Sequence, residues 1–496
     1  MMTSVTLAER VSSAPARLWP GLVGIGINVA ITVPLAALLN IWQDEAYTLH
    51  TTARGFAYAF DQAVGFEQNA PLYFVALTAW RHLGSSIFFL RLFSVLCVAA
   101  SVALLPAIAR RYLPRQNPLL LTLVVACNPF VVWAAVEMRV YAGIVLISAL
   151  LLLTFYDAFV RQAPSKAAAA GYAVFVALAL YTQYYLAFLV AAQGIAVAIY
   201  FRRSSLRFFL AGLAGAAAFV PMLVIVPGQM QNFRDGFASP SLVASFSGLA
   251  GILLRYVLPL PAAHAKLLYV AILLAVALAL LAARPKWSGA GNLWALVTAI
   301  CAAVLFAAGT FAFGVHVLDR HAASLYLPST IAAFALFSCF RAPLERRAAL
   351  AWSCLVLVLS LLALGRTYAG LAKPGDWIRV AAYIEGRETP NEPIVVFEAE
   401  NALPFAYYYR GPNRVVPIPR AVDFRRFQAT RFVIRNDADL EQSVPAGHRI
   451  WLVTAGQCAS SNIQFGCDRL ERFVARRYRA VLTATFQGAQ VRLLER

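Results

Sequence analysis

The sequence predicts a polytopic α-helical membrane protein, with about 11 transmembrane helices, that carries a soluble α/β domain at its carboxyl end. The 496 residues are 61% hydrophobic and only 13% charged, which is far more apolar than a soluble domain. Long apolar runs continue to about residue 366, after which the composition becomes mixed, charged and aromatic. We therefore divide the chain into a membrane domain, residues 1–369, and a soluble domain, residues 370–496.

The predicted spans follow from the lengths of the apolar runs, because a helix needs about 20 residues to cross the roughly 30 Å hydrocarbon layer. The runs lie near residues 20–41, 87–109, 119–136, 140–157, 168–185, 186–201, 207–226, 264–283, 290–314, 322–340 and 347–366. Two further apolar stretches, 71–80 and 241–258, are ambiguous. The first makes only about 18 Å of helix, so we place it in the membrane interface, where Tyr73 and Trp80 suit the headgroup region.

The basic residues predict the orientation of these spans. With this set, nearly all the basic connections fall on the same side as the amino terminus. They contain Arg10, Arg17, Arg110, Arg111, Arg115, Arg161, Lys166, Arg202, Arg203, Arg207, Arg284, Lys286, Arg341, Arg346 and Arg347. This is the positive-inside pattern and predicts a cytoplasmic amino terminus. The acidic pair at residues 44 and 45, and the whole soluble domain, would then be external.

The charge of the chain excludes some classes of function. Cytoplasmic anchoring accounts for much of the net charge of +19, so we expect no nucleic-acid partner. The milder basic excess of the soluble domain indicates a solvated surface, with an anionic surface or acceptor as the alternative. Residues 1–20 contain no short apolar core with a small-residue cleavage site, so we expect the first span to be an anchor rather than a cleaved signal.

The soluble domain is predicted to alternate helices and strands. We expect helices at residues 376–385, 405–409 and 468–474, and strands at 393–397, 449–454 and 478–486. The domain contains no Walker loop, dinucleotide fingerprint or metal-finger spacing, so we expect no chemistry from it alone. Five of the seven cysteines fall in predicted spans. Cys458 and Cys467 lie in the soluble domain, where they either form a disulfide or stay free, since sequence does not show their separation.

Two adjacent carboxylates, Asp44 and Glu45, directly follow the first span. The apolar residues between Leu49 and Phe60 have helical spacing, which predicts amphipathic helical structure on the outer membrane surface in this first external loop. In one interpretation Asp44 caps this helix and Glu45 interacts favourably with its dipole. In the other, a carboxylate at the lipid–water boundary removes a proton from a substrate hydroxyl. Adjacent helix positions point roughly 100° apart, so one acid can be the base and the other an orienting group.

Several short motifs carry a resemblance that covers most of the chain. They are Asp44-Glu45-Ala46-Tyr47-Thr48, Asn69-Ala70-Pro71-Leu72-Tyr73-Phe74, Leu90-Arg91-Leu92-Phe93-Ser94, Met138-Arg139-Val140-Tyr141, Tyr181-Thr182-Gln183-Tyr184-Tyr185, Asp376-Trp377-Ile378-Arg379 and Tyr407-Tyr408-Tyr409-Arg410. In order and predicted sidedness they resemble polyprenyl-phosphate-sugar-dependent glycosyltransferases of the GT-C fold. This group includes protein O-mannosyltransferases, lipid A aminoarabinose transferases and related bacterial lipopolysaccharide sugar transferases.

The resemblance implies an enzyme of the bacterial inner membrane, with its carboxyl-terminal domain in the periplasm. It would move a sugar from a polyprenyl-phosphate donor to an envelope acceptor, whether lipid, glycan or protein, by inverting in-line displacement. Asp44 carries over as the catalytic base, with Glu45 beside it. Glu137 is nearest to the second acidic position that such enzymes often have after the third span, although its side chain could instead pair with Arg139.

The substrate-binding residues that we expect are external. They are Glu67, Asn69, Tyr73, Glu137, Arg139, Tyr141, Gln183, Tyr184, Arg320 and His321. Of these, Arg139, Arg320 and His321 are the best candidates to bind the donor phosphate. Arg234 and Arg255 come next, with headgroup anchoring as the alternative for both.

The chain departs from the family pattern at two positions that bear on phosphate and metal contacts. Asn69-Ala70 replaces a frequent His-Pro, and Gln183 replaces a frequent His. We expect no required cofactor. A divalent ion bound by Asp44, Glu67 and His316 or His321 is the alternative.

A transporter or flippase of lipid-linked sugars is the principal alternative function, and an assembly scaffold is the third. A transporter predicts paired half-repeats, broken helices and charges within the spans, whereas polar residues here cluster at the outer ends of the spans. No motif encodes the sugar, the acceptor or the length of the lipid chain, because pocket shape determines these.

Overall fold

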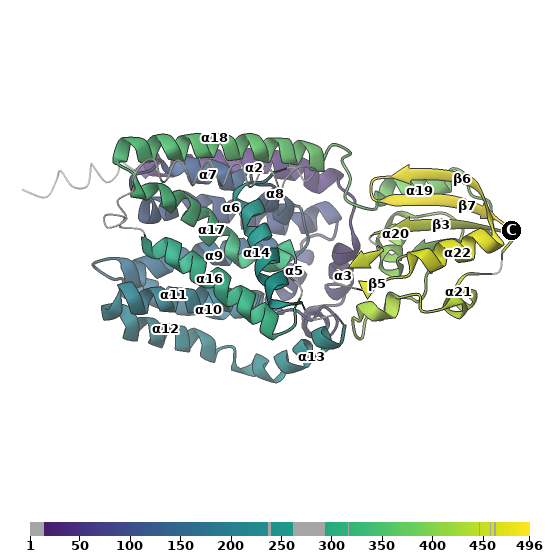
Figure 1. Cartoon of the computed structure of the whole chain (residues 1–496), viewed down its shortest axis with the longest axis horizontal. Coiled ribbons are helices and arrows are strands. Elements are labelled where there is room, and N and C mark those ends of the chain that lie inside the picture. The colour runs from purple at the N-terminus through teal and green to yellow at the C-terminus, as the bar shows by residue number, and fades with distance from the viewer. Residues whose placement is uncertain are drawn as a thin grey trace, which may run out of the picture.

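The computed structural model describes residues 14–236, 240–260, 293–315, 317–445, 447–456, 458–460 and 463–496. It consists of a helical bundle and a smaller α/β domain, which lies against one end of the bundle (Figure 1). The predicted span 264–283 and the candidate ligand His316 lie outside the described residues, as does the side chain of Arg234.

Six of the described helical segments are long and apolar enough to cross a membrane. They are α2 (Ala14–Leu38), α6 (Ile87–Tyr112), α9 (Tyr141–Phe155) with its π-helical extension to Val160, α16 (Leu293–Ala312), the continuous helical stretch Asp319–Cys339 that contains α17 (Tyr326–Ala335), and α18 (Ala342–Thr367). The bent pair α7 (Pro118–Ala126) and α8 (Pro129–Ala135) makes a seventh if it is one span. The predicted class of multi-pass helical membrane protein is confirmed.

Within the described part of the chain, fewer helices qualify as full spans than the sequence predicts, and the reasons are local. Helices α10 (Lys166–Thr182) and α11 (Leu186–Tyr200) have 17 and 15 residues and meet where Gln183 is extended. Each is about 22–26 Å long, shorter than the hydrocarbon layer. The predicted span 207–226 divides into α12 (Ser205–Ala217) and a 3₁₀ segment, Val220–Val224, that contains Pro221. Helix α14 (Leu242–Val257) is also a short apolar helix.

The basic turns gather at one end of the bundle. Arg111 at the end of α6 pairs with Asp157 at 2.7 Å, Arg115 lies 3.8 Å from Glu345 at the start of α18, and Ser204 donates a hydrogen bond to the carbonyl of Phe159. Helix α18 runs from this end towards the α/β domain (Figure 1). The basic turns and the α/β domain therefore lie at opposite ends of the bundle, the arrangement that the positive-inside pattern requires.

The first external loop, named for its predicted orientation, lies between α2 and α6. It contains three short helices, α3 (Gln43–Thr51), α4 (Phe56–Gly65) and α5 (Leu72–Arg81). The sequence predicts continuous helical spacing between residues 49 and 60, and this prediction is wrong. Helix α3 ends at Thr51, and α4 begins at Phe56 after Gly55, whose φ is 103°. Helix α3 is also not a surface helix, since most of its side chains are buried. Nor does Asp44 cap it: the N-cap is Trp42, and Asp44 lies in the first turn. Helix α5 has ten residues and spans nothing, as expected.

The α/β domain is built on a five-stranded sheet of order β2-β1-β3-β7-β6. Its strands are β1 (Ile394–Phe397), β2 (Val415–Pro417), β3 (Arg449–Ala455), β6 (Arg479–Phe486) and β7 (Ala489–Glu495). Strand β1 is parallel to both β2 and β3, whereas β7 is antiparallel to β3 and β6. Trp377 and Trp451 fill the core on one face, and Leu452 and Phe473 lie in the core on the other.

The helices that cover this sheet are α19 (Trp377–Glu385), α20 (Ala402–Tyr408), α21 (Asp437–Ser443) and α22 (Cys467–Arg477). Most elements of the domain agree with the sequence prediction. Strands β2 and β7, the two short strands at residues 459–460 and 463–464, and helix α21 were not expected from the sequence. The expected domain boundary at residues 369 and 370 falls in the connection between α18 and α19.

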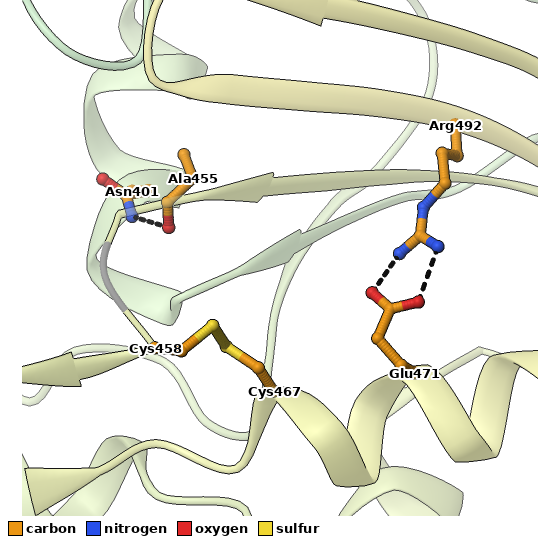
Figure 2. The surroundings of a disulfide bond; sticks show 6 residues. All are labelled: Asn401, Ala455, Cys458, Cys467, Glu471 and Arg492. Carbon is orange, nitrogen blue, oxygen red and sulfur yellow. Dashed lines mark hydrogen bonds and ion pairs between the residues drawn. A yellow bond between two sulfur atoms is a disulfide. The ribbon is translucent and has the colours of Figure 1, made fainter.

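A disulfide closes the loop between β3 and α22. Cys458 and Cys467 are joined, which settles the alternative that the sequence left open. Figure 2 shows the bond close to two contacts that hold the same region: Asn401 donates to the carbonyl of Ala455, and Arg492 pairs with Glu471. The small hairpin of β4 (Ala459–Ser460) and β5 (Ile463–Gln464) lies within the closed loop.

Removing the disulfide should destabilise the α/β domain moderately. The two cysteines are nine residues apart, and loop-closure entropy for so short a loop corresponds to about 2–3 kcal/mol. We expect the double variant Cys458→Ser/Cys467→Ser to unfold at lower temperature and to lose the sensitivity of the wild type to reductant. Cys354→Ser, which removes an exposed free thiol, is the control. Equal unfolding temperatures for the double variant and the wild type would contradict the expectation.

Candidate functional site

The candidate site lies around α3, at the end of the bundle next to the α/β domain (Figure 1). Four of the predicted residues meet there: Asp44 of α3, Glu67 of the connection to α5, Arg139 between α8 and α9, and Arg320 from the 3₁₀ turn Asp319–Leu325. They come from three separate loops, with Asp44 and Glu67 both in the first, so the packing of the bundle brings them together.

Asp44 faces two arginines. Arg320 Nη1 lies 3.2 Å from Asp44 Oδ2, and Arg139 Nε lies 4.0 Å from the same oxygen. Arg139 also binds Glu67 at 2.7 Å and lies over the ring of Phe74, but its Nε has no hydrogen-bond partner among the described residues. The side chain of Arg320 is 31% exposed, so the site can be reached from this side. The group consists of one carboxylate flanked by two guanidinium groups, which suit phosphate oxygens.

Glu45 has a different environment from its neighbour, although the two are adjacent in sequence. It is fully buried, and Arg91 binds both of its oxygens, at 2.9 and 2.8 Å. Lys373 Nζ lies 2.7 Å from Oε2, and the amide of Met138 donates to Oε1. Burial opposes ionisation, but the two cations outweigh it and lower the pKa of Glu45 to about 2. Glu45 is therefore a buried anion that fixes α3 to three other segments.

Glu137 shares the same lysine. Lys373 Nζ lies 2.9 Å from Glu137 Oε1, and the indole of Trp42 donates to Oε2 at 2.5 Å. Burial raises the pKa of Glu137 to about 7, against the opposing effect of Lys373. Burial, followed by repulsion from Arg91, lowers the pKa of Lys373. The pairing of Glu137 with Arg139 that the sequence left open is not the one seen: the partner of Arg139 is Glu67.

Glu67 and Asn69 shape the end of the first external loop. Glu67 accepts from Thr51 at 3.2 Å and from Arg139, and burial raises its pKa. The side-chain amide of Asn69 donates to the backbone carbonyl of Glu67, and the backbone N–H of Asn69 donates to the carbonyl of Ala63. Glu67 therefore orients an arginine of the site, whereas the side chain of Asn69 folds back on its own loop.

The predicted aromatic and amide residues are distributed around this group. Tyr141 interacts electrostatically with Arg320, Arg139 and Asp44, and stacks on Trp133 at a ring separation of 4.7 Å. Tyr73 is buried and contacts Ser94 at 3.1 Å.

The remaining predicted residues make contacts of their own. Tyr184 donates to Gln229, and the buried Gln183 side chain has an unpaired Oε1 among the described residues. The ring of His321 accepts from the amide of Leu318 and lies 6.0 Å from that of Tyr185. No described contact joins these side chains to Asp44.

The α/β domain contributes residues that the sequence analysis missed. The phenol of Tyr47, one helical turn after Asp44, donates to the buried carboxylate of Glu400. Burial raises the pKa of Glu400 to about 7, with the charge of Asp44 acting in the same direction. Two residues earlier, burial and repulsion from Glu400 raise the pKa of Glu398 to about 8. Their position directly after the predicted strand 393–397 was the signal in the sequence that could have identified Glu398 and Glu400, because strand ends often carry functional groups.

Further contacts fasten this domain to the first external loop. Tyr47 and Phe66 pack edge-on to Phe427, at ring separations of 6.0 and 6.1 Å, and the amide of Ile41 donates to the hydroxyl of Tyr408 at 2.8 Å. The site is therefore closed on one side by the α/β domain rather than by lipid.

A divalent ion does not fit the described part of the site. No three His, Cys, Asp or Glu side chains gather there as metal ligands, and Asp44 and Glu67 both already face arginine. Guanidinium groups beside these two carboxylates repel a cation.

Comparisons with known proteins identify the fold. No protein-family model matches the chain, and a search of curated proteins gives no match. Among solved structures, the crystal structure of ArnT from Cupriavidus metallidurans bound to undecaprenyl phosphate matches with a TM-score of 0.51 and 14% identity, covering 95% of this chain and 97% of that one. The chain has the ArnT fold. The structure of ArnT in the apo state matches with a TM-score of 0.54 and 12% identity over the same shares. The ArnT fold extends over both domains, which confirms the GT-C fold class that the sequence resemblance implies.

Removing Arg91 should be strongly destabilising. Arg91→Met would leave the buried Glu45 with a single cation and would leave the carbonyls of Ala36, Leu39 and Asn40 without their donor. Loss of one partner from a buried ion pair costs about 3–5 kcal/mol. We expect a lower unfolding temperature of the purified protein in detergent. Arg366→Met on α18, in which the charge removed is exposed, is the control, and a similar loss in both variants would argue against the network.

The stability of the protein should fall as the pH rises from about 5 to 8. Glu398 and Glu400 have folded-state pKa values of about 8 and about 7, above the 4.5 of an unfolded chain, so the folded state holds more protons in this window. We expect the stability of Glu398→Gln relative to the wild type to increase by at least about 1 kcal/mol between pH 5 and pH 8. Unfolding temperatures across this range would test this, with Glu441→Gln as control. A wild-type slope in Glu398→Gln would be inconsistent with the raised pKa.

Proposed function

We propose that this protein is a membrane glycosyltransferase that moves a sugar from a polyprenyl-phosphate donor to an envelope acceptor. The observation that carries the proposal is the placing of Asp44 between Arg320 and Arg139, at the end of the bundle opposite the basic turns. The solved ArnT structure of the same fold was bound to undecaprenyl phosphate, which supports a lipid-phosphate partner for this chain as well. The positive-inside pattern supports a site on the outer face of the membrane, and the proposed reaction then takes place on the periplasmic face of a bacterial inner membrane.

The reaction is an inverting displacement. Asp44 accepts the proton of the acceptor hydroxyl while its oxygen forms a bond to the anomeric carbon. The bond from that carbon to the phosphate oxygen breaks on the opposite face, and the polyprenyl phosphate leaves with the electron pair. Arg320 and Arg139 stabilise the charge that develops on the phosphate. No general acid is needed, because phosphate is a good leaving group.

Binding of such a donor would change the contact between Arg320 and Asp44. Arg320 makes a single contact with Asp44 through one nitrogen and is partly exposed, so its other nitrogens can bind phosphate oxygens. When Arg320 turns to the phosphate, Asp44 Oδ2 becomes available to the acceptor hydroxyl. Glu67 holds Arg139 in place, and Glu45, with both oxygens engaged, orients α3 rather than the substrate.

Asp44→Asn should abolish transfer while leaving donor binding intact. The amide keeps the shape of the side chain but cannot accept the proton, and loss of a general base costs about 10²–10⁴ in rate. We would measure release of polyprenyl phosphate from a panel of polyprenyl-phosphate sugars, with the protein in lipid nanodiscs and an envelope extract as acceptor. The control is Asp61→Asn on α4, an exposed acid of the same loop.

The outcomes separate the alternatives. Full activity in Asp44→Asn would overturn its role as base and direct attention to Glu67 and Glu400. A wild-type protein that releases no polyprenyl phosphate, yet moves the lipid-linked sugar across the bilayer, would favour a flippase. The donor and the extract fraction that support release would identify the sugar and the acceptor class.

A further inference from the structure

Lys373 is a buried cation in the connection between the membrane bundle and the α/β domain. It is 5% exposed, and its ammonium contacts three acceptors: Glu45 Oε2 at 2.7 Å, Glu137 Oε1 at 2.9 Å and the carbonyl of Val136 at 3.1 Å. An ammonium has three protons, and each of these acceptors can take one. The side chain is thus fully satisfied within the protein.

The backbone around Lys373 is fixed on both domains. Its amide donates to the side chain of Asn40, at the end of the first span. On either side, the carbonyl of Ala372 accepts from the Gln487 side chain, and the amide of Gly375 donates to the carbonyl of Gln487, in the turn between β6 and β7. The position of the ammonium therefore depends on how the α/β domain is seated on the bundle.

Two short routes lead from Lys373 to the proposed base. The first passes through Glu45, the residue next to Asp44 in α3. The second passes from Glu137 to the indole of Trp42, whose ring lies under the Arg320 guanidinium at 5.7 Å, and Arg320 contacts Asp44 at 3.2 Å. Lys373 is thus linked both to the helix that carries Asp44 and to the arginine that faces it.

Stability alone does not account for a lysine at this position. Glu45 already has a bidentate partner in Arg91, and a buried ion pair is often no more stabilising than apolar side chains of similar volume. A lysine that joins two carboxylates from different loops instead specifies one relative placement of those loops.

We propose that Lys373 is a positioning residue for the transfer reaction. By bridging Glu45 and Glu137 it holds Asp44 and Arg320 in their reactive arrangement, so that the site is complete only when the α/β domain is docked. This inference rests on the proposed function.

The test compares Lys373→Met with Lys373→Met/Glu137→Gln. The double variant removes one cation and one anion together, and glutamine can still accept from Trp42, so it keeps the charge balance and should fold even where the single variant does not. We expect kcat to fall about 100-fold in the double variant, because a displacement of about 1 Å costs that much, while KM for the donor stays unchanged. Arg387→Met, an exposed cation of the same domain, is the control and should keep the wild-type kcat.

A second measurement does not depend on turnover. Trp42 emission, obtained as the difference between spectra with and without Trp42→Phe, reports on the indole between Glu137 and Arg320. Glu137→Gln changes the partner of the indole and shifts its emission by itself, so the comparison is with that variant: we expect a further shift in Lys373→Met/Glu137→Gln. An unshifted emission together with wild-type kcat would overturn the inference. A shifted emission in a protein whose wild type transfers no sugar would overturn the proposed function while showing that Lys373 still organises these loops.

Discussion

The buried carboxylate of Glu45 is the charge on which the arrangement of the external loops depends. A carboxylate removed from water is tolerated only where cations and hydrogen-bond donors replace the lost solvent. Here the replacements come from three separate segments, through Arg91 in α6, the amide of Met138 after α8, and Lys373 after α18. Satisfying this one anion therefore brings α3 together with α6, the segment after α8 and the connection between α18 and the α/β domain.

Adjacent acids in α3 thereby acquire different chemistry. Asp44 and Glu45 point in different directions from the helix. Glu45 faces inward to fixed partners, whereas Asp44 faces Arg139 and the partly exposed Arg320. A rigidly held anion and a reachable one can then occupy neighbouring positions, which is how a site is commonly built from a supporting group and a reactive group.

The α/β domain has a larger part in the site than its sequence suggests. It supplies no recognisable catalytic motif, yet Glu400 and Tyr408 contact the first external loop, and Phe427 packs against α3 and the segment after α4. These contacts exclude water and lipid from one side of α3. The low-dielectric surroundings strengthen the electrostatic interactions of the site.

The sequence by itself determined the class of fold, the division into two domains and the separation of basic turns from acidic loops. Hydropathy and charge placement suffice for these, because the bilayer acts on each segment independently. It also identified Asp44, Glu67, Arg139 and Arg320 as candidates. Only the tertiary structure decided their partners, since Lys373 and Glu45 are separated by 328 positions and no local pattern encodes such a contact. The break at Gly55, the burial of α3 and the part of Glu400 were likewise decided only in the tertiary structure, where α3 packs against the α/β domain instead of lying on the membrane surface.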